Sequence, residues 1–275
     1  HTRCVSVTGV QTCALPIHRK CLNLHHGVNI SNKFMELIER CIAEPTYDDT
    51  WNLIDPHTKE TVRTVSARDL WLKILENRVA TGEPYVCFID HINDALPETQ
   101  KALGLKVNHS NLCTEITLPT AEDRTAVCCL SSVNLETYDE WKNDKLFIGD
   151  LVRFLDNVLT SFIETAPEHV FRAKFSATQE RSIGLGAMGF HAYLQKCGIP
   201  FESALAKAKN LNIFKYIKAE AVAESKRLAV KRGEAPDMEG TGMRNAHLLI
   251  ILPVALMLLL SALGIWPVDM IYMKM

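Results

Sequence analysis

Residues 84–90 read PYVCFID, a continuous apolar run that lies between turn-forming residues. A short apolar run without polar alternation is typical of a strand that is buried on both faces. Two further short apolar runs follow at residues 112–118 and 126–135. We therefore expect buried strands in this chain, rather than strands that expose one polar face.

Segments with helical periodicity separate these runs. Ser31 is the expected N-cap of a helix over residues 32–43, and Ser66 followed by Asp69 is typical of the start of a helix that ends near Ala80. The other expected elements are a loop or hairpin over residues 48–64 and helices over residues 147–164, from 179–182 to 196, and over residues 203–232. Buried strands that alternate with helices predict an α/β architecture.

Composition excludes several classes of protein. The chain has 275 residues, of which 47% are hydrophobic and 23% charged, so it is neither a disordered tail nor a collagen-like fibre. Its 30 Lys and Arg against 32 Asp and Glu give a net charge of -2, which disfavours bulk binding to nucleic acid. Nine cysteines are too few for a disulfide-rich secreted scaffold, and no secretory signal opens the sequence. We expect a reducing, cytoplasmic setting.

Both ends of the sequence differ from its middle. Within residues 1–17, the stretch VTGVQTCALPI resembles the translation of a sequencing-library adapter, so we expect this segment to be non-native. Residues 246–268 carry no charge and exceed the ~20 apolar residues that span a bilayer. A membrane anchor is one interpretation. An out-of-frame translation is the favoured one, so that residues 250–275 would not belong to the native protein and no membrane association would follow.

Two motifs suggest chemistry that we do not expect. Residues 184–189 match G-x-G-x-x-G, but they follow a polar, helical stretch at residues 177–181 instead of a hydrophobic strand. We expect these glycines to allow close packing of a buried helix. The adjacent pairs His25-His26 and Cys128-Cys129 lack the spacing of a metal site. No metal site is predicted.

The stretch SNLCTE at residues 110–115 is the strongest candidate for a site. On an extended segment, Asn111, Cys113 and Glu115 would project to the same side. A carboxylate can act as a general base, and a thiol can act as a nucleophile or give up a hydrogen atom. The alternative is a buried strand with two satisfied polar groups. Cys128 follows in the segment AVCCLSSVNL at residues 126–135.

These two segments closely resemble the large catalytic subunit of class I ribonucleoside-diphosphate reductases. The resemblance rests on N-x-C-x-E at residues 111–115, followed by Leu-Pro, and on V-C-x-L-S-x-x-N-L at residues 127–135. Further similar segments lie at residues 25–30, 82–85, 90–91, 181–186 and 242–248. The resemblance covers about residues 18–249 and implies part of the family's ten-stranded α/β barrel.

The resemblance also implies a role for each matching residue. Cys113 matches the cysteine that becomes a thiyl radical and abstracts the ribose 3′-hydrogen. Glu115 matches the base that takes the 3′-hydroxyl proton, and Asn111 matches the amide that binds the substrate. Cys128 matches one of two thiols that deliver reducing equivalents and close to a disulfide. The implied substrate-binding residues are Ser110, Asn111, Leu112, Cys113, Thr114 and Glu115.

Partners and cofactors follow from the same resemblance. The family implies no cofactor bound by this chain, and a radical supplied by a small partner subunit with a dimetal centre of iron or manganese. It also implies a homodimer of the large subunit, thioredoxin or glutaredoxin as reductant, and a ribonucleoside diphosphate as substrate. The partner thiol of Cys128 and the nucleotide effector sites would lie outside this sequence. We therefore expect this chain to be inactive alone.

Two other interpretations stay open. A cobalamin-dependent radical nucleotide reductase uses the same combination of cysteine and glutamate, and a requirement for a partner subunit would distinguish the two. A tail-anchored membrane protein of non-enzymatic function would make residues 246–268 a true anchor. Membrane fractionation of the native product would test that interpretation.

Overall fold

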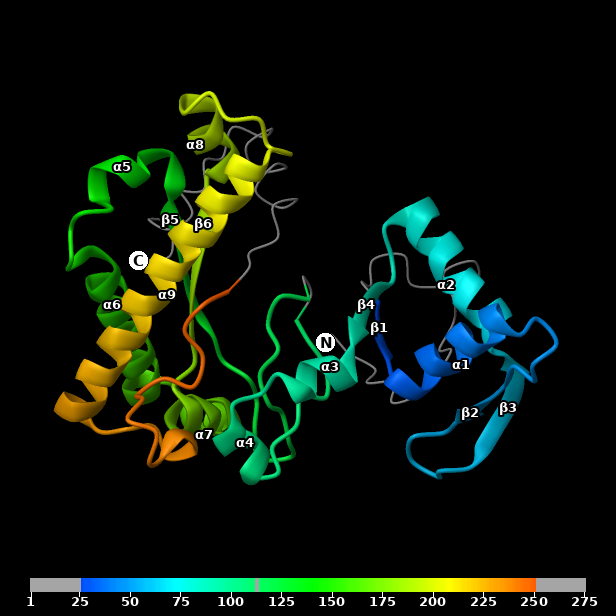
Figure 1. Ribbon diagram of the computed structural model, residues 1–275. Coiled ribbons are helices and arrows are strands. Elements are labelled where there is room, and N and C mark those ends of the chain that lie inside the picture. Colours follow the sequence, from blue (N-terminus) through cyan, green and yellow to red (C-terminus); the bar gives the residue numbers. More distant parts are fainter. Residues whose placement is uncertain (1–25, 112–113, 251–275) are drawn as a thin grey trace. The chain divides into compact units, whose positions relative to one another are not determined.

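The computed structural model describes residues 26–111 and 114–250 (Figure 1). The chain divides into two compact units. The first unit holds the described residues up to Leu96 together with Leu105–Thr120, and the second unit holds Pro97–Gly104 and the described residues from Ala121 onward. The adapter-like segment 1–17 and the apolar residues after 250 lie outside the described residues, so their interpretation stays a prediction.

The first unit is built around two parallel strands. β1 (Gly27–Ile30) pairs with β4 (Tyr85–Phe88), and Gly27 lies opposite Tyr85. The connection between these strands contains α1 (Asn32–Ala43), an antiparallel hairpin of β2 (Thr50–Ile54) and β3 (Thr61–Ser66), and α2 (Ala67–Thr81). α3 (Ile89–Asp94) follows β4 directly. The unit is therefore a parallel strand pair joined by helices.

Local chemistry explains where these helices begin and end. The Ser31 side chain accepts a hydrogen bond from the backbone N–H of Phe34, and Ser66 Oγ accepts one from the N–H of Asp69 at 3.1 Å. Each bond satisfies an N–H that the first turn of a helix leaves unpaired. Gly82 ends α2 with a φ of 77°, which glycine adopts without strain. Both predicted helix starts are confirmed.

The apolar core of the first unit joins β1, α1, the hairpin and α2. The Phe34 and Trp51 rings meet edge to face with their centroids 5.0 Å apart. The buried members of this core are Ile30, Phe34, Ile38, Leu53, Ala67, Leu70 and Ile74. The hairpin is thus packed against the helices, in the region where the sequence predicted a loop or hairpin.

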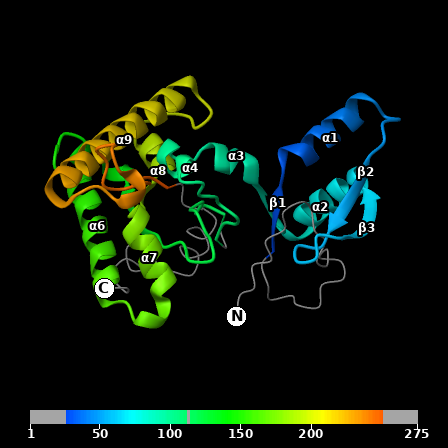
Figure 2. The same ribbon diagram turned by 90° about the horizontal axis from the view of Figure 1, so that it is seen from below.

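The second unit also contains a parallel strand pair. β5 (Cys129–Asn134) pairs with β6 (Ile183–Met188), with Cys129 opposite Ile183. The other elements are α4 (Glu98–Ala102), η2 (Leu135–Thr137), α5 (Tyr138–Trp141), α6 (Phe147–Thr165), η3 (Glu168–Val170), α7 (Phe171–Glu180), α8 (Phe190–Lys196), α9 (Ala204–Arg232) and η4 (Pro236–Met238). The long helices α6 and α9 lie side by side (Figure 2). Buried side chains of both helices, among them Leu155 and Ile217, share the core of this unit with β5 and β6.

The sequence predicted one helix that begins near residues 179–182 and ends at residue 196. The first half of this prediction is wrong. α7 ends at Glu180, Arg181 takes a φ of 45°, and the glycine-rich residues form β6 before α8 begins. The glycines of this motif therefore lie in a strand and in the turn that follows it, and not in a buried helix as expected. A Cβ at Gly184 would lie 2.6 Å from Leu130 Cδ2 on β5, and one at Gly189, where φ is 75°, would lie 2.4 Å from Asn134 Oδ1.

The other strand predictions have mixed outcomes. The apolar runs at residues 84–90 and 126–135 contain β4 and β5, as expected. The described part of the run at residues 112–118 forms no strand. There Thr114 has a φ of 67°, and its N–H donates to the carbonyl oxygen of Asn111 at 3.1 Å, which makes a turn. The α/β class itself is confirmed by two parallel strand pairs, each with helices in its connection.

The apolar sequence near the C-terminal end also raised the possibility of a membrane span. Over the ranges that the structure describes, no helix combines the length and the apolar character that crossing a bilayer requires. Most of residues 246–268 lie beyond those ranges.

Candidate functional site

The candidate site is a loop of the first unit, and asparagine side chains hold its two ends. Asn29 on β1 donates from Nδ2 to the carbonyl oxygen of Asn108 at 2.7 Å. Asn93 on α3 binds both backbone groups of Val107, accepting from its N–H at 2.8 Å and donating to its carbonyl oxygen at 3.0 Å. Asn108 Nδ2 in turn donates to the carbonyl oxygen of Thr120 at 2.7 Å. The loop is thus closed at its base by side chains from two secondary-structure elements.

Within the loop, the turn at Thr114 brings three predicted residues together. Asn111 Nδ2 donates to Glu115 Oε1 at 2.7 Å, and Asn111 Oδ1 accepts from the backbone N–H of Ile116 at 3.1 Å. Ser110 Oγ donates to the carbonyl oxygen of Ile116 at 2.6 Å. The amide and the carboxylate therefore face each other. The sequence predicted an extended segment with both side chains on one side, whereas a turn produces the contact in the structure.

Among the described residues, Glu115 has a hydrogen-bond partner at one of its two carboxylate oxygens. Its Oε2 atom is buried and makes no hydrogen bond with any described residue, and the same is true of Thr114 Oγ1. A buried acceptor without a partner is uncommon in native proteins, and a catalytic role is one of the explanations for it. Leu112 and Cys113 lie outside the described residues, so the position of the thiol in this loop stays a prediction.

The predicted redox thiol belongs to the second unit. Cys128 is half-buried immediately before β5, with its Sγ atom 3.9 Å from the carbonyl oxygen of Cys129. Cys129 starts β5 and packs against the apolar core. Burial raises the pKa of the Cys129 thiol, and the opposing effect of Arg181 is smaller. Cys129 therefore stays protonated and serves packing.

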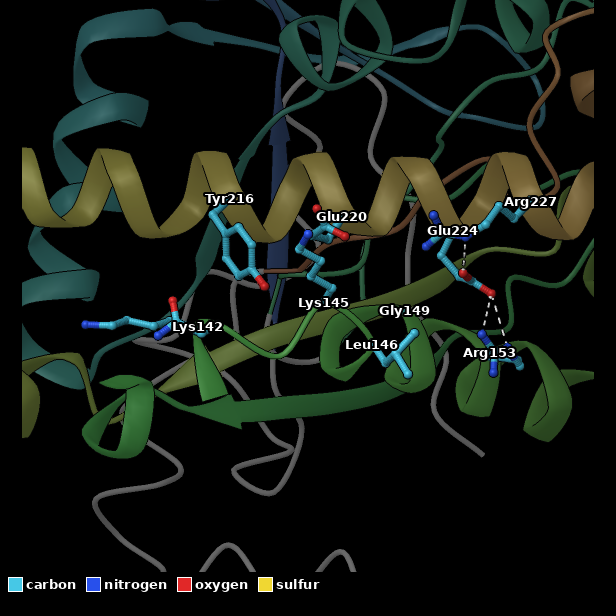
Figure 3. Close-up of a pocket in the computed structure, with 10 residues that line it drawn as sticks. Lys142, Lys145, Leu146, Gly149, Arg153, Tyr216, Glu220, Glu224 and Arg227 are labelled. Atoms are coloured by element: carbon cyan, nitrogen blue, oxygen red, sulfur yellow. Dashed lines mark hydrogen bonds and ion pairs between the residues drawn. The ribbon is translucent and has the colours of Figure 1, made fainter. Parts of the chain in front are cut away.

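A charged hollow of about 750 Å³ also lies in the second unit, between α6 and α9 (Figure 3). Glu224, only 3% exposed, accepts from Arg153 at 3.1 Å and from Arg227 at 2.7 Å. A Cβ at Gly149 would lie 3.2 Å from Glu224 Oε2, so the glycine lets α9 approach α6. This arrangement joins two helices, and the predicted site residues do not line the hollow. In the described ranges, no group of three or more His, Cys, Asp or Glu side chains is placed to hold a metal ion.

Sequence reasoning missed a buried ionic cluster around Asp156. The Asp156 carboxylate is fully buried and accepts from Arg181 at 2.9 Å, from Arg232 at 2.8 Å and from Arg244 at 2.9 Å. Burial alone would raise the pKa of Asp156, but Arg181 and Arg244 hold it below its ordinary value. The feature of the sequence that could have indicated this cluster is a single carboxylate between Leu155 and Leu159, which are both buried in an apolar helix.

Comparison with known proteins identifies the family. A family model described as ribonucleotide reductase, barrel domain, matches residues 17–252. The chain belongs to the ribonucleotide reductase family. The strands form two-stranded sheets in the described part of the chain, where they close no barrel, which agrees with the expected partial α/β barrel of the ribonucleotide reductase type.

Ribonucleotide reductase relatives match most of this chain. A protein of Frog virus 3 (isolate Goorha), named as a ribonucleoside-diphosphate reductase large subunit, is 51% identical over 258 residues, which cover 93% of this chain and 44% of the relative. The large subunit of Invertebrate iridescent virus 3 is 40% identical, over 86% of this chain and 45% of the relative. The chain therefore spans less than half the length of these relatives.

A solved ribonucleotide reductase has a similar fold. The Actinobacillus ureae class Id ribonucleotide reductase alpha subunit matches with a TM-score of 0.72 and 36% sequence identity. The match covers 84% of this chain and 40% of that subunit. Sequence and structure comparisons therefore agree on the family and on the partial coverage.

Proposed function

We propose that the protein to which this chain belongs reduces ribonucleoside diphosphates to deoxyribonucleoside diphosphates by thiyl-radical chemistry. The observation that carries the proposal is the Asn111–Glu115 pair, which leaves one buried carboxylate oxygen available next to the position of Cys113 in the sequence. Family membership and the names of the relatives support the same reaction.

Each residue of the loop has a distinct task in this proposal. The thiyl radical at Cys113 abstracts the 3′-hydrogen of the ribose. Glu115 takes the 3′-hydroxyl proton through its open Oε2, because its other oxygen is already held by Asn111. Asn111 orients this base and the substrate without titrating itself. Removal of the 3′-hydroxyl proton eases the loss of the 2′-hydroxyl as water.

The reducing equivalents come from thiols. Cys128 and a second cysteine each give up one electron and one proton and close to a disulfide, while the substrate loses its 2′-oxygen as water. Thioredoxin or glutaredoxin then reduces the disulfide. Cys128 is half-buried, as suits a thiol that must be reached in turn by substrate and reductant.

The proposal includes a partner and a location. The radical originates at a dimetal centre of iron or manganese in a small partner subunit, and this chain binds no cofactor of its own. The large subunit forms a homodimer, and nucleotide effectors bind outside the present sequence. A cytoplasmic location suits an enzyme that depends on thiols.

The test is turnover with purified components. The longest product of the gene is assayed for conversion of a ribonucleoside diphosphate, with dithiothreitol as reductant and with or without its small subunit. The proposal predicts deoxyribonucleotide only when both subunits are present, and none from residues 18–249 alone. Turnover that needs cobalamin and no partner would contradict the proposed radical source, and no turnover under any condition would contradict the function.

A further inference from the structure

Around two buried acidic side chains, the second unit holds more cations than carboxylates. The first of these side chains is Asp156, whose carboxylate is shared by Arg181, Arg232 and Arg244. None of these guanidinium groups pairs with a second carboxylate among the described residues. Burial lowers the pKa of Arg181, and Arg244 and Arg232 lower it further, whereas Asp156 opposes the change. One buried negative charge therefore serves three positive charges.

The second of these side chains is Glu224, which lies on α9 and is 3% exposed. Its carboxylate accepts from Arg153 of α6 and from Arg227 of α9 (Figure 3). Arg153 also pairs with the exposed Asp150 at 3.0 Å, and Lys231 pairs with no described residue. With Lys231 included, the two groups therefore contain six cations and three carboxylates.

A hollow of about 320 Å³ lies where the two groups meet, between α6 and the last turns of α9. It shares Arg153, Glu224 and Arg227 with the larger hollow of Figure 3 and continues that hollow toward the end of α9. Its residues on α9 are spaced at i, i+3, i+4, i+7 and i+8, which places them on one face of the helix. They are Glu224, Arg227, Leu228, Lys231 and Arg232. Together with Arg153, four cations and one carboxylate thus line the hollow.

The cations of the hollow have donors left for a ligand. Arg232 binds Asp156 and Asn157 through Nη1, and its Nε and Nη2 make no hydrogen bond with a described residue. Among the described residues, Arg227 uses only its Nε, which donates to Glu224 at 2.7 Å. These free donors, the excess of positive charge and the hollow occur at the same place. We infer that the hollow is an anion site that binds a phosphate group, either free phosphate or the phosphate of a small metabolite.

Phosphate matches both the charge and the size of the hollow. A phosphate group carries about 1.5–2 negative charges near pH 7, so it reduces the excess of positive charge more than a single carboxylate does. Guanidinium groups also bind phosphate through two parallel N–H···O bonds. Pockets for small ligands have volumes of about 300–1,000 Å³, so a hollow of about 320 Å³ has room for phosphate with a small organic group, and not for a polymer. A bound phosphate would join α6 to the last turn of α9.

Calorimetric titration of inorganic phosphate into the longest product of the gene tests the site without any assay of activity. Lys231→Glu is the test variant, because Lys231 lines the hollow and contacts no described residue, so both buried carboxylates keep their partners. Lys218→Glu is the matched control, since it makes the same charge change at an exposed lysine of α9 outside the hollow. Lys218 lies about 20 Å from Lys231 along the helix, beyond the Debye length of about 10 Å in about 0.1 M salt.

The anion site predicts that Lys231→Glu weakens phosphate binding by at least about tenfold, while Lys218→Glu binds phosphate like the wild type. Phosphate sites elsewhere in the protein are the same in both variants, so the difference reports the hollow. Ribose 5-phosphate is the second probe. An affinity no higher than that of phosphate would assign the site to free phosphate, and a higher affinity that Lys231→Glu removes would assign it to a phosphorylated metabolite. No binding of either probe by the wild type, or equal binding by the two variants, would overturn the inference.

Discussion

Asn111 donates a 2.7 Å hydrogen bond from Nδ2 to Oε1 of Glu115, and the second, buried oxygen of the same carboxylate makes no hydrogen bond with a described residue. One oxygen therefore fixes the orientation of the group while the other is available to a proton. An amide suits this task because it does not titrate, so the base is held at any working pH. This relationship is the structural basis of the proposed reductase chemistry.

Replacing the proposed base tests its role. Glu115→Gln keeps the shape of the side chain but removes its ability to take a proton, so we expect turnover of the reductase to fall by about 10²- to 10⁴-fold. Steady-state formation of deoxyribonucleotide measures the effect, with the exposed Glu122→Gln as the matched control. If Glu115→Gln turned over as fast as the control variant, Glu115 would not be the base.

The Glu180 carboxyl should make stability fall as pH rises. Its pKa is raised from 4.5 to about 7 in the folded chain, so between these values the folded state binds more protons than the unfolded state. We therefore expect the difference in unfolding free energy between Glu180→Gln and the wild type to change in favour of the variant by up to about 3 kcal/mol from pH 5 to pH 8. Urea unfolding at several pH values measures this difference. A difference that does not change with pH would contradict the prediction.

The His247 ring should act in the opposite sense. Its pKa is lowered from 6.5 to about 4, so the unfolded state binds more protons in this range and stability falls as pH falls from about 6.5 toward 4. His247→Gln should remove this loss, whereas the exposed His169→Gln should keep it. Urea unfolding at pH 5 and pH 7 compares the three proteins. Equal acid sensitivity in all of them would show that His247 is not the cause.

Glycine at position 189 is required by space as well as by backbone conformation. Gly189 and Gly198 have φ values of 75° and 66°, but a Cβ would meet Asn134 Oδ1 at 2.4 Å only at Gly189, and nothing within 4 Å at Gly198. Asn134 Oδ1 accepts from the N–H of Glu136, which would lose this partner. We expect Gly189→Ala to lower the free energy of unfolding by about 1–3 kcal/mol more than Gly198→Ala. Equal losses in chemical denaturation would contradict this reasoning.

Local signals were enough to predict much of the fold. The side chains of Ser31 and Ser66 cap the helices whose starts they predicted, and the run at residues 84–90 contains β4. The strand at Ile183–Met188 could not be predicted in this way. Two of its residues are glycines, which favour no local structure, and its pairing with the distant β5 decides its conformation.

The candidate site was predicted in part. The sequence placed Asn111 and Glu115 on one side of a strand, and the structure brings them together through a turn that the alternating pattern does not show. The buried carboxylates were missed for a different reason. The pKa values of Asp156 and Glu180 depend on residues far along the chain, such as Arg244 and Gln100. No local pattern carries that information.

The most direct test of the central claim is the turnover of the Cys113→Ser variant of the reductase with its small subunit. A hydroxyl does not form the thiyl radical that the proposal requires, so turnover should be abolished while binding of the ribonucleoside diphosphate persists. Cys197→Ser, at an exposed cysteine of the second unit, is the matched control and should keep wild-type turnover. Substantial turnover by Cys113→Ser would contradict the account.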